Sequence, residues 1–396
     1  MNLFALSDEA LIKLAKDHST PFFVYDAATA RRNFQRLRAA LPQRVRLAYA
    51  VKANPHHELL TLFASLGASF DCASIGELER VAALDTGPGR IYFTGPGKRQ
   101  IELERACTLN ARIQAEGWED LERLDRIARG PLNVNLRVHP AGGVEESNQI
   151  IGGSGPSAFG IDEEDLEEIL LRAEGLKKVR IRGLHVFAAS NELDASRLLA
   201  THAMVLALGH RMQDALGVPL EQIDLGGGLG VPYTARFDPL DVEELGRGLE
   251  SLLADASWFK GELILEPGRY LAAECGLYLV RVVRSKRSRG TRFLILEAGV
   301  NHLLRPLLTG QDFPIRAVGA SGALSPATLA GPLCTSLDRL GTTELPDLEP
   351  GALLAFGVCG AYGKTEAMTQ FLSHPEATEV WFDGSGPAQP ANLTRS

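Results

Sequence analysis

The chain contains few cysteines, no long apolar run and no basic leader, and each of these absences excludes a class of protein. The five cysteines among 396 residues are scattered and show no C-x-x-C spacing. Neither a disulfide framework nor a zinc site is therefore expected, and we predict no bound metal. No apolar stretch approaches the roughly 20 residues that cross a membrane. The first residues, MNLFALSDEALIKLAKD, include early acids and no basic leader, which predicts a cytoplasmic protein without a signal peptide.

Basic residues are also too sparse to form a nucleic-acid surface. The formal net charge is −8, and the densest basic stretch is RSKRSRG at residues 284–290. This stretch separates two strand-like segments, so we interpret it as a solvated hairpin loop. With 45% hydrophobic and 23% charged residues, the composition is typical of a soluble globular protein. We therefore expect neither nucleic acid nor a membrane as a partner.

One lysine has an unusual position, in the segment RLAYAVKANP at residues 46–55. Apolar and small residues alternate there, which predicts a strand that Asn54 and Pro55 end. Lys52 is expected on the same strand face as Ala48 and Ala50, whose small side chains leave space beside it. A surface lysine at a strand end is the simpler interpretation, and a lysine that faces a ligand is the alternative.

Short apolar strands and amphipathic helices alternate from residue 28 to residue 275. Eight βα units over roughly 250 residues are typical of a (β/α)8 barrel rather than an open doubly wound sheet. Strand-like segments follow, which predict a β-domain of residues 276–383 that also takes in residues 1–27. The tail, residues 384–396, is rich in Gly, Pro and Ser and is expected to be disordered. The predicted barrel strands are VRLAYAVK, ASFDCAS, RIYFTG, ARIQAE, LNVNLRV, IRGLHVFA, QIDLGGG and ELILEPG.

Polar residues gather at the predicted C-terminal ends of these strands, where barrel enzymes have their active sites. Together these residue types suit the binding of a phosphorylated ligand, although each residue alone also has a structural explanation. The residues are Lys52, Asp71, Arg137, His185, Gly226, Gly227, Gly228, Glu266 and Arg269.

The glycines of DLGGG directly follow a strand, so their backbone N–H groups can close on an anion such as a phosphate. A plain tight turn is the alternative. Glu266 leaves a buried strand next to Arg269, either as a structural ion pair or to bind a ligand. His185 can lie flat on an aromatic ring or fill the core. With the amine of Lys52, this set suits pyridoxal phosphate, which needs an amine, a phosphate site and an acid at its ring nitrogen.

Seven motifs in order resemble those of the barrel-type (fold type III) pyridoxal-phosphate decarboxylases, the family of diaminopimelate and ornithine decarboxylases. The resemblance covers nearly the whole chain, and it implies an alanine-racemase-like barrel with an added β-domain and a homodimer that shares its active sites. The motifs are YAVKANP, FDCASIGEL, HVFAAS, DLGGG, EPGRY, GPLCTSLD and GAYG.

The resemblance also implies the roles of individual residues. Lys52 forms the Schiff base with the cofactor, and Cys334 reprotonates the product carbon after carbon dioxide leaves. A lone cysteine is otherwise usually a small buried apolar residue. The cofactor-binding residues are Lys52, Asp71, Arg137, His185, Gly226, Gly227, Gly228, Glu266, Gly268, Arg269 and Tyr362. The substrate-binding residues are Arg269, Arg305, Thr335, Asp338 and Tyr362.

Two departures from the family pattern bear on the substrate. Diaminopimelate decarboxylases have a glutamate after the catalytic cysteine, and ornithine decarboxylases an aspartate, whereas this chain has Thr335. RPLLTG keeps Arg305 but has Thr309 where the family motif RPxLYG has a tyrosine. A buried ammonium without a carboxylate partner costs several kcal/mol, so free diamino acids are disfavoured. A glutamate-like substrate, or one tethered to an acyl or peptidyl carrier protein, is compatible with this set. The segments GPLCTSLDRLG and AYGKTEAMTQFLSHPEATEV resemble a branch of decarboxylases that accompany biosynthetic or exopolysaccharide-linked gene sets. Some members of that branch act on an aminoacyl group held on a carrier protein.

Two other functions remain open from the sequence. A racemase on a similar barrel needs a second base opposite Lys52. A non-catalytic relative that binds the cofactor and acts as a regulator usually lacks the lysine or the thiol, and this chain keeps both. The segment of residues 141–160 is either a substrate lid or a structural connector.

Overall fold

The computed structural model describes residues 3–84, 86–141, 155–384 and 389–390. Most of the predicted disordered tail and most of the segment 141–160 lie outside these residues; within the tail, Gln389–Pro390 form a short strand, which the sequence did not predict. The chain divides into two compact units: unit 1 contains Met1–Asn33, Pro232–Asp238 and Arg269–Ser396, and unit 2 contains Phe34–Val231 and Pro239–Gly268. Residues 28–33, 232–238 and 269–275, which the sequence assigned to the barrel, thus belong to unit 1. Across the described ranges, no helix has the length and apolar character that a bilayer span requires.

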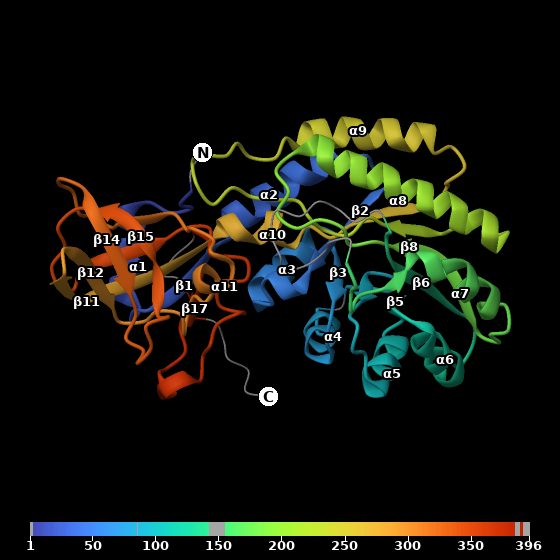
Figure 1. Cartoon of the computed structure of the whole chain (residues 1–396), viewed down its shortest axis with the longest axis horizontal. Helices are drawn as coiled ribbons and strands as arrows, with labels where there is room; N and C mark the ends of the chain where they lie inside the picture. Colours follow the sequence, from blue (N-terminus) through green and yellow to red (C-terminus); the bar gives the residue numbers. More distant parts are fainter. Residues whose placement is uncertain (1–2, 85, 142–154, 385–388, 391–396) are drawn as a thin grey trace. The chain divides into compact units, whose positions relative to one another are not determined.

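Unit 2 is built on eight parallel strands that form a closed barrel (Figure 1). Neighbouring strands pair in the order β5-β4-β3-β2-β10-β9-β8-β6, and a pairing between β5 and β6 closes the ring. The side chains of Ala48, Tyr92 and Ile264 pack together as an apolar cluster. The barrel strands are β2 (Val45–Ala50), β3 (Ser69–Cys72), β4 (Ile91–Phe93), β5 (Arg112–Ala115), β6 (Leu132–His139), β8 (Val179–His185), β9 (Gln222–Asp224) and β10 (Glu262–Leu265), and β7 (Ile161–Asp162) pairs with the end of β6.

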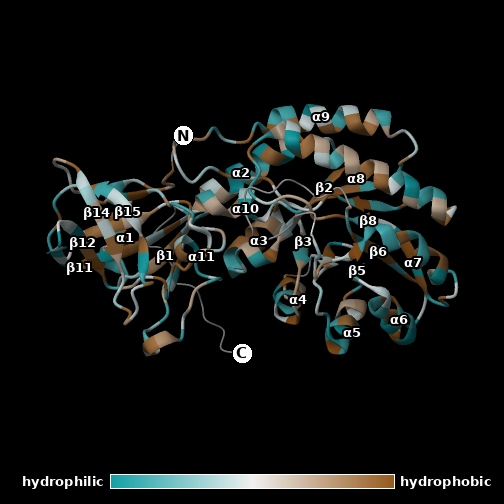
Figure 2. Cartoon of the chain, in the orientation of Figure 1, coloured by the Kyte–Doolittle hydropathy of each residue, from teal (hydrophilic) through white to brown (hydrophobic). Residues whose placement is uncertain are grey.

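Amphipathic helices connect the barrel strands. Figure 2 shows polar and apolar residues alternating around α5 to α9, as expected for helices with one buried face. Local sequence sets their ends: Ser74 accepts a hydrogen bond from the N–H of Glu77 at the start of α4, and Gly217 ends α8 in the left-handed conformation. The helices are α2 (Ala27–Ala40), α3 (His57–Ser65), α4 (Ile75–Ala82), α5 (Gln100–Thr108), α6 (Trp118–Ile127), α7 (Leu166–Ala173), α8 (Ala195–Leu216) and α9 (Val242–Asp255), with the short α10 (Gly268–Ala272) after β10 and 3₁₀ turns at Glu163–Asp165 and Ala273–Cys275.

All eight predicted barrel strands are confirmed, with one local difference at Lys52. Strand β2 ends at Ala50, and Lys52 lies in the 3₁₀ turn Val51–Ala53 that follows it. Pro55 therefore does not end the strand itself. The hydroxyl of Tyr49 donates to the backbone oxygen of Asn54 at 2.9 Å, which holds this turn against the strand. The lysine is thus on a fixed turn at the C-terminal end of the barrel.

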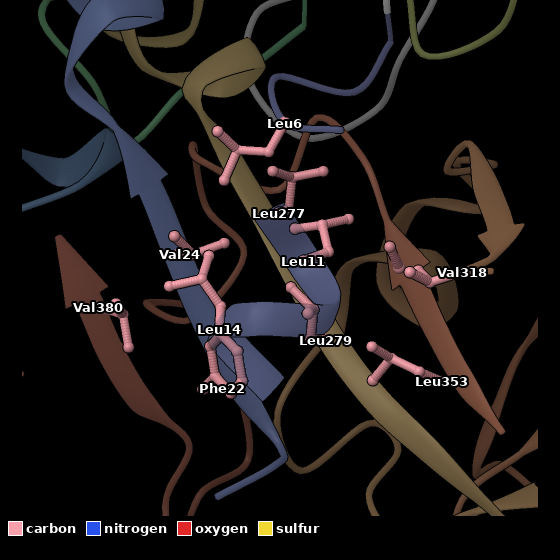
Figure 3. Packing of buried hydrophobic residues seen from close by; sticks show 11 residues of the cluster. Leu6, Leu11, Leu14, Phe22, Val24, Leu277, Leu279, Val318, Leu353 and Val380 are labelled. Atoms are coloured by element: carbon pink, nitrogen blue, oxygen red, sulfur yellow. The ribbon is translucent and has the colours of Figure 1, made fainter. Parts of the chain in front are cut away.

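Unit 1 contains a nine-stranded mixed sheet. Strand β1 (Phe22–Asp26), from the N-terminal segment 1–27, joins this sheet as predicted. Leu11 and Leu14 of helix α1 pack against Phe22 and Leu279 of the sheet (Figure 3). The main path of the sheet is β15-β14-β12-β11-β1-β17-β18, and β16 joins β11 to β13. The elements are α1 (Asp8–Asp17), β1 (Phe22–Asp26), β11 (Gly276–Ser288), β12 (Thr291–Leu296), α11 (Arg305–Thr309), β13 (Ile315–Ala317), β14 (Ser325–Ala330), β15 (Arg339–Leu345), β16 (Leu353–Phe356), β17 (Thr378–Phe382) and β18 (Gln389–Pro390), with a 3₁₀ turn at Phe371–Ser373.

The basic stretch RSKRSRG is mostly strand rather than loop. Strand β11 continues to Ser288, and its exposed end pairs with β12. Only Arg289 and Gly290 form the turn, with φ of +51° and +83°, the conformation of a two-residue type I′ hairpin turn. The predicted hairpin is therefore correct, but its loop is much shorter than expected.

Candidate active site

The strand pairing places predicted site residues from separate strands at the same height along the barrel. In the strand register, Ala50 pairs with Asp71, Arg137 pairs with His185, and His185 pairs with Asp224. All of these residues lie at or next to the C-terminal ends of their strands. Because the carboxyl ends of barrel strands share one face, the polar side chains converge there.

Lys52 faces an acid at this end of the barrel. Its Nζ lies 3.4 Å from Oδ2 of Asp71, whose side chain is fully buried, while the lysine side chain is one-third exposed. The Nζ also lies 5.3 Å from the centroid of the Phe187 ring. A Cβ on Gly268 would come within 2.9 Å of Ala50 Cβ, so this glycine lets the chain after β10 pack against the Lys52 turn.

Glu266 and Asp224 form a buried acidic pair beside His185. One ring nitrogen of His185 and one carboxylate oxygen from each acid all lie within 4.8 Å of one another. Burial, with added repulsion from Asp224 and Asp71, holds the pKa of Glu266 well above its usual range. Burial raises the pKa of Asp224 to about 7, and Asp71 adds to this effect. Such a pair favours a cation placed next to it, and a protonated ring nitrogen is one such group.

His185 is buried and has no hydrogen-bond partner at either ring nitrogen among the described residues. Its Nε2 lies 3.7 Å from Oε1 of Glu266, and that oxygen is likewise buried without a hydrogen bond in the described parts of the chain. Burial, followed by the charges of Arg137, Lys52 and Lys98, lowers the pKa of His185 well below its usual value. Unsatisfied buried polar atoms are rare in native proteins, so these atoms fit a site that receives a polar group of a bound ring.

The DLGGG glycines pack tightly and leave two donors available. Gly226 has φ of +70°, and a Cβ there would lie 2.6 Å from the carbonyl oxygen of Val186. Its N–H donates to Oδ1 of Asp224 at 2.9 Å. The N–H groups of Gly227 and Gly228 have no hydrogen-bond partner within the described ranges. The glycines therefore serve backbone packing, and their two adjacent free donors also fit a phosphate.

Arg137 belongs to a buried charge network. Its NH1 lies 3.0 Å from Oε1 of Glu116, and its guanidinium stacks on Phe159 at 4.7 Å. Lys98 lies 3.8 Å from the same Glu116 oxygen and 3.1 Å from Oδ2 of Asp120. Glu116 pairs with the guanidinium of Arg137. Arg137, which pairs with His185 in the strand register, therefore affects His185 through its positive charge, which helps to lower the pKa of the histidine.

Unit 1 holds a second cluster of predicted residues. The guanidiniums of Arg269 and Arg305 lie 4.9 and 4.8 Å from the centroid of the Tyr362 ring. Arg269 donates to the hydroxyl of Tyr233 at 2.8 Å, and Arg305 bonds to Glu366 at 2.7 Å. Tyr362 has φ of +60°, an unusual conformation for a bulky residue, and such strain concentrates at functional sites.

The exposed Cys334 lies in the loop between β14 and β15, and Asp338 organises that loop. The Asp338 carboxylate accepts the N–H of Leu333 at 2.7 Å and that of Val300 at 2.8 Å. A Cβ on Gly299 or Gly331 would collide with this carboxylate, so both glycines are needed to seat it. These contacts favour a positioning role for Asp338, whereas the sequence predicted that it binds substrate.

We therefore expect Asp338→Ala to destabilise the protein by about 2 to 6 kcal/mol, since it leaves two buried N–H groups unsatisfied at about 1 to 3 kcal/mol each. Asp338→Asn keeps one acceptor oxygen and should lose less. Urea unfolding measures both variants. If Asp338 bound substrate instead, Asp338→Asn would raise KM without changing the free energy of unfolding.

The sequence prediction missed several members of these clusters. Asp224 and Glu116 stand at or directly after strand ends, so the rule that selected Asp71 and His185 also identifies them. Glu366 is different, because only the fold brings it to Arg305 from 61 positions away. The missed residues are Lys98, Glu116, Asp120, Phe187, Asp224, Tyr233 and Glu366.

Comparisons with known proteins identify the family of the chain. The model of the pyridoxal-binding domain of pyridoxal-dependent decarboxylases matches residues 27–273. Diaminopimelate decarboxylase of Deinococcus radiodurans is 33% identical over 383 residues, which cover 96% of this chain and 94% of that protein. The L-glutamyl-[BtrI acyl-carrier protein] decarboxylase of Niallia circulans is 29% identical over 392 residues, covering 95% and 91%. The crystal structure of diaminopimelate decarboxylase from Helicobacter pylori complexed with L-lysine is 29% identical, has a TM-score of 0.88, and matches 96% of this chain and 95% of its own. The chain therefore belongs to the pyridoxal-dependent decarboxylases of the diaminopimelate and ornithine type, carboxy-lyases that act on amino acids with pyridoxal phosphate as cofactor.

Proposed function

We propose that Lys52 binds the aldehyde of pyridoxal phosphate covalently at the C-terminal end of the barrel. One observation carries this proposal. Polar atoms of Glu266 and His185 are buried without hydrogen-bond partners among the described residues, and Lys52 lies at the C-terminal end of the same barrel. When bound, the cofactor supplies an electron sink for the electron pair left by the departing carboxylate. The lysine amine lies 3.4 Å from Oδ2 of the buried Asp71, which would position it for this reaction.

The other barrel residues would hold and orient the cofactor. Glu266 would keep a proton on the ring nitrogen, because a cation beside it restores the ionised form of this buried acid. His185 would lie against the ring face, and the N–H groups of Gly227 and Gly228 would bind the phosphate. The resemblance also implies that Tyr362 binds the phosphate.

Cys334 would donate the proton that replaces carbon dioxide on the product carbon. We propose that it does so in a cytoplasmic homodimer, where the loop of one subunit completes the site of the other. Several apolar side chains of unit 1 are exposed and would be available to such an interface. They are Leu307, Leu308, Leu337, Met368, Phe371 and Leu372.

The substrate would be glutamate-like or tethered to a carrier protein. Thr335 follows the catalytic thiol where the family has an acid, so no carboxylate is supplied there for a distal ammonium. The Niallia circulans relative is named for an aminoacyl group on a carrier protein. Tethering converts the distal carboxyl to a thioester, which carries no charge.

A decarboxylation screen tests the proposed substrate. Free amino acids labelled with ¹³C at the α-carboxyl are compared with the same residues loaded on a phosphopantetheine carrier, and released ¹³CO₂ is measured. We expect release from the glutamyl carrier to exceed release from diaminopimelate or ornithine. Faster release from either free diamino acid would contradict the proposal, and loss of optical activity without ¹³CO₂ would indicate a racemase.

A further inference from the structure

Arg305, the expected ligand for the distal end of the substrate, is already paired within unit 1. Its NH1 lies 2.7 Å from Oε2 of Glu366, and the arginine side chain is 6% exposed. Its Nε donates to the side chain of Gln311 at 3.2 Å, and its guanidinium lies over Tyr362. The positive charge of Arg305 is therefore compensated before any substrate arrives.

The two threonines that replace family residues add no compensating group. The Thr309 hydroxyl donates to the backbone oxygen of Arg305 at 2.9 Å and accepts from the N–H of Gln311 at 3.2 Å. The Thr335 hydroxyl accepts from the N–H of Leu337 at 3.2 Å. Both side chains are thus engaged with the backbone of their own segments, and neither carries a charge.

A compensated pair discriminates against both signs of charge. A free distal carboxylate approaching Arg305 meets the carboxylate of Glu366, and like charges at such short range repel. A distal ammonium approaching Glu366 meets Arg305 in the same way. An uncharged carbonyl avoids both penalties and can still accept a hydrogen bond from the guanidinium.

We propose that Glu366 determines substrate specificity by neutralising Arg305, so that the site selects amino acids whose distal carboxyl is an amide, an ester or a thioester. This inference rests on the proposed function, in which Arg305 meets the distal end of the substrate. It gives the physical reason why a carrier-bound glutamyl group would be accepted and free glutamate rejected.

Binding of small amines to the holoenzyme tests this inference without requiring turnover. The probes are 4-aminobutyramide, 4-aminobutyrate and 1,4-diaminobutane, which carry a neutral, an anionic and a cationic distal group. Each is titrated into the protein, and the shift of the cofactor absorption band gives its Kd. For the wild-type protein we expect the amide to bind at least about tenfold more tightly than either charged probe.

Two variants each remove one charge of the Arg305–Glu366 ion pair. Glu366→Gln keeps an acceptor for Arg305 but frees its charge, so the preference for 4-aminobutyrate over the amide should rise by at least about tenfold. Arg305→Gln frees the charge of Glu366 and should raise the preference for 1,4-diaminobutane by a similar factor. Opposite shifts in the two variants cannot come from general loosening of the site.

Glu376→Gln is the matched control, because Glu376 is exposed and lies 3.9 Å from Lys364. Its three Kd values should keep their wild-type ratios within about twofold. Unchanged ratios in Glu366→Gln with the cofactor band intact would overturn the inference and leave the proposed function standing. If no probe shifted the band in any variant and Lys52 carried no cofactor, the proposed function would fail and the inference with it.

Discussion

Replacing Lys52 with alanine is expected to remove the lysine-bound absorption band of the cofactor and to reduce decarboxylation at least about 10³-fold. Loss of a proton-transfer group alone typically costs 10²–10⁴-fold, and this variant also loses the covalent attachment. The contacts proposed for Glu266, His185 and the glycines do not depend on the amine, so some cofactor should still bind without a covalent link. Absorbance spectra and ¹³CO₂ release measure the two effects.

Lys260→Ala is the matched control for this variant, because Lys260 is exposed on the same unit. It should keep the absorption band and full activity. Thermal unfolding of both variants shows whether the barrel is intact. Decarboxylation by folded Lys52→Ala at near wild-type rate would exclude this lysine from the chemistry.

Replacing Cys334 with alanine is expected to lower kcat by about 10²–10⁴-fold while the cofactor stays bound to the enzyme. The thiol is exposed in a loop whose backbone is held by Asp338, so the substitution removes a proton donor without opening a core cavity. Cys107→Ala is the control, since Cys107 lies on helix α5 and burial raises its pKa. Unchanged kcat in Cys334→Ala would remove this residue from the mechanism.

Mixing the Lys52→Ala and Cys334→Ala variants tests the proposed sharing of active sites between subunits. If the Cys334 loop of one subunit completes the site of the other, a heterodimer of Lys52→Ala and Cys334→Ala contains one intact site. Mixed and refolded protein should then regain part of the wild-type activity. Persistent inactivity of a heterodimer demonstrated by mass spectrometry would place both residues of a site on one subunit.

The barrel was predictable because each of its strands can be identified from its local sequence. Each strand is a short apolar run ended by polar or glycine residues, and eight such runs with helices between them leave few alternative folds. Lys52 was misplaced by one element, because periodicity does not distinguish the last residues of a strand from a 3₁₀ turn. Strands β15 and β17 were not predicted, because RLGTTEL and TEVWF mix polar and apolar residues and are only partly buried, so neither contains a continuous apolar run.

Candidate site residues were predictable where they stand at strand ends. They were not predictable where they depend on contacts between residues distant in the sequence. Asp71, His185 and Glu266 stand at or next to strand ends, which local sequence identifies. The pairing of Arg305 with Glu366 depends on the start of helix α11 meeting the loop that follows β16, and nothing near either residue predicts it. The same limit applies to Asp338, whose partner N–H at Val300 comes from a segment before β14.

The most direct test of the account is to locate the cofactor on the chain. Protein saturated with pyridoxal phosphate is reduced with borohydride, digested and analysed by mass spectrometry. The account predicts one phosphopyridoxyl adduct, on Lys52 in the peptide that contains YAVKANP. A stoichiometric adduct on another lysine, or an unmodified Lys52 peptide from saturated protein, would contradict it.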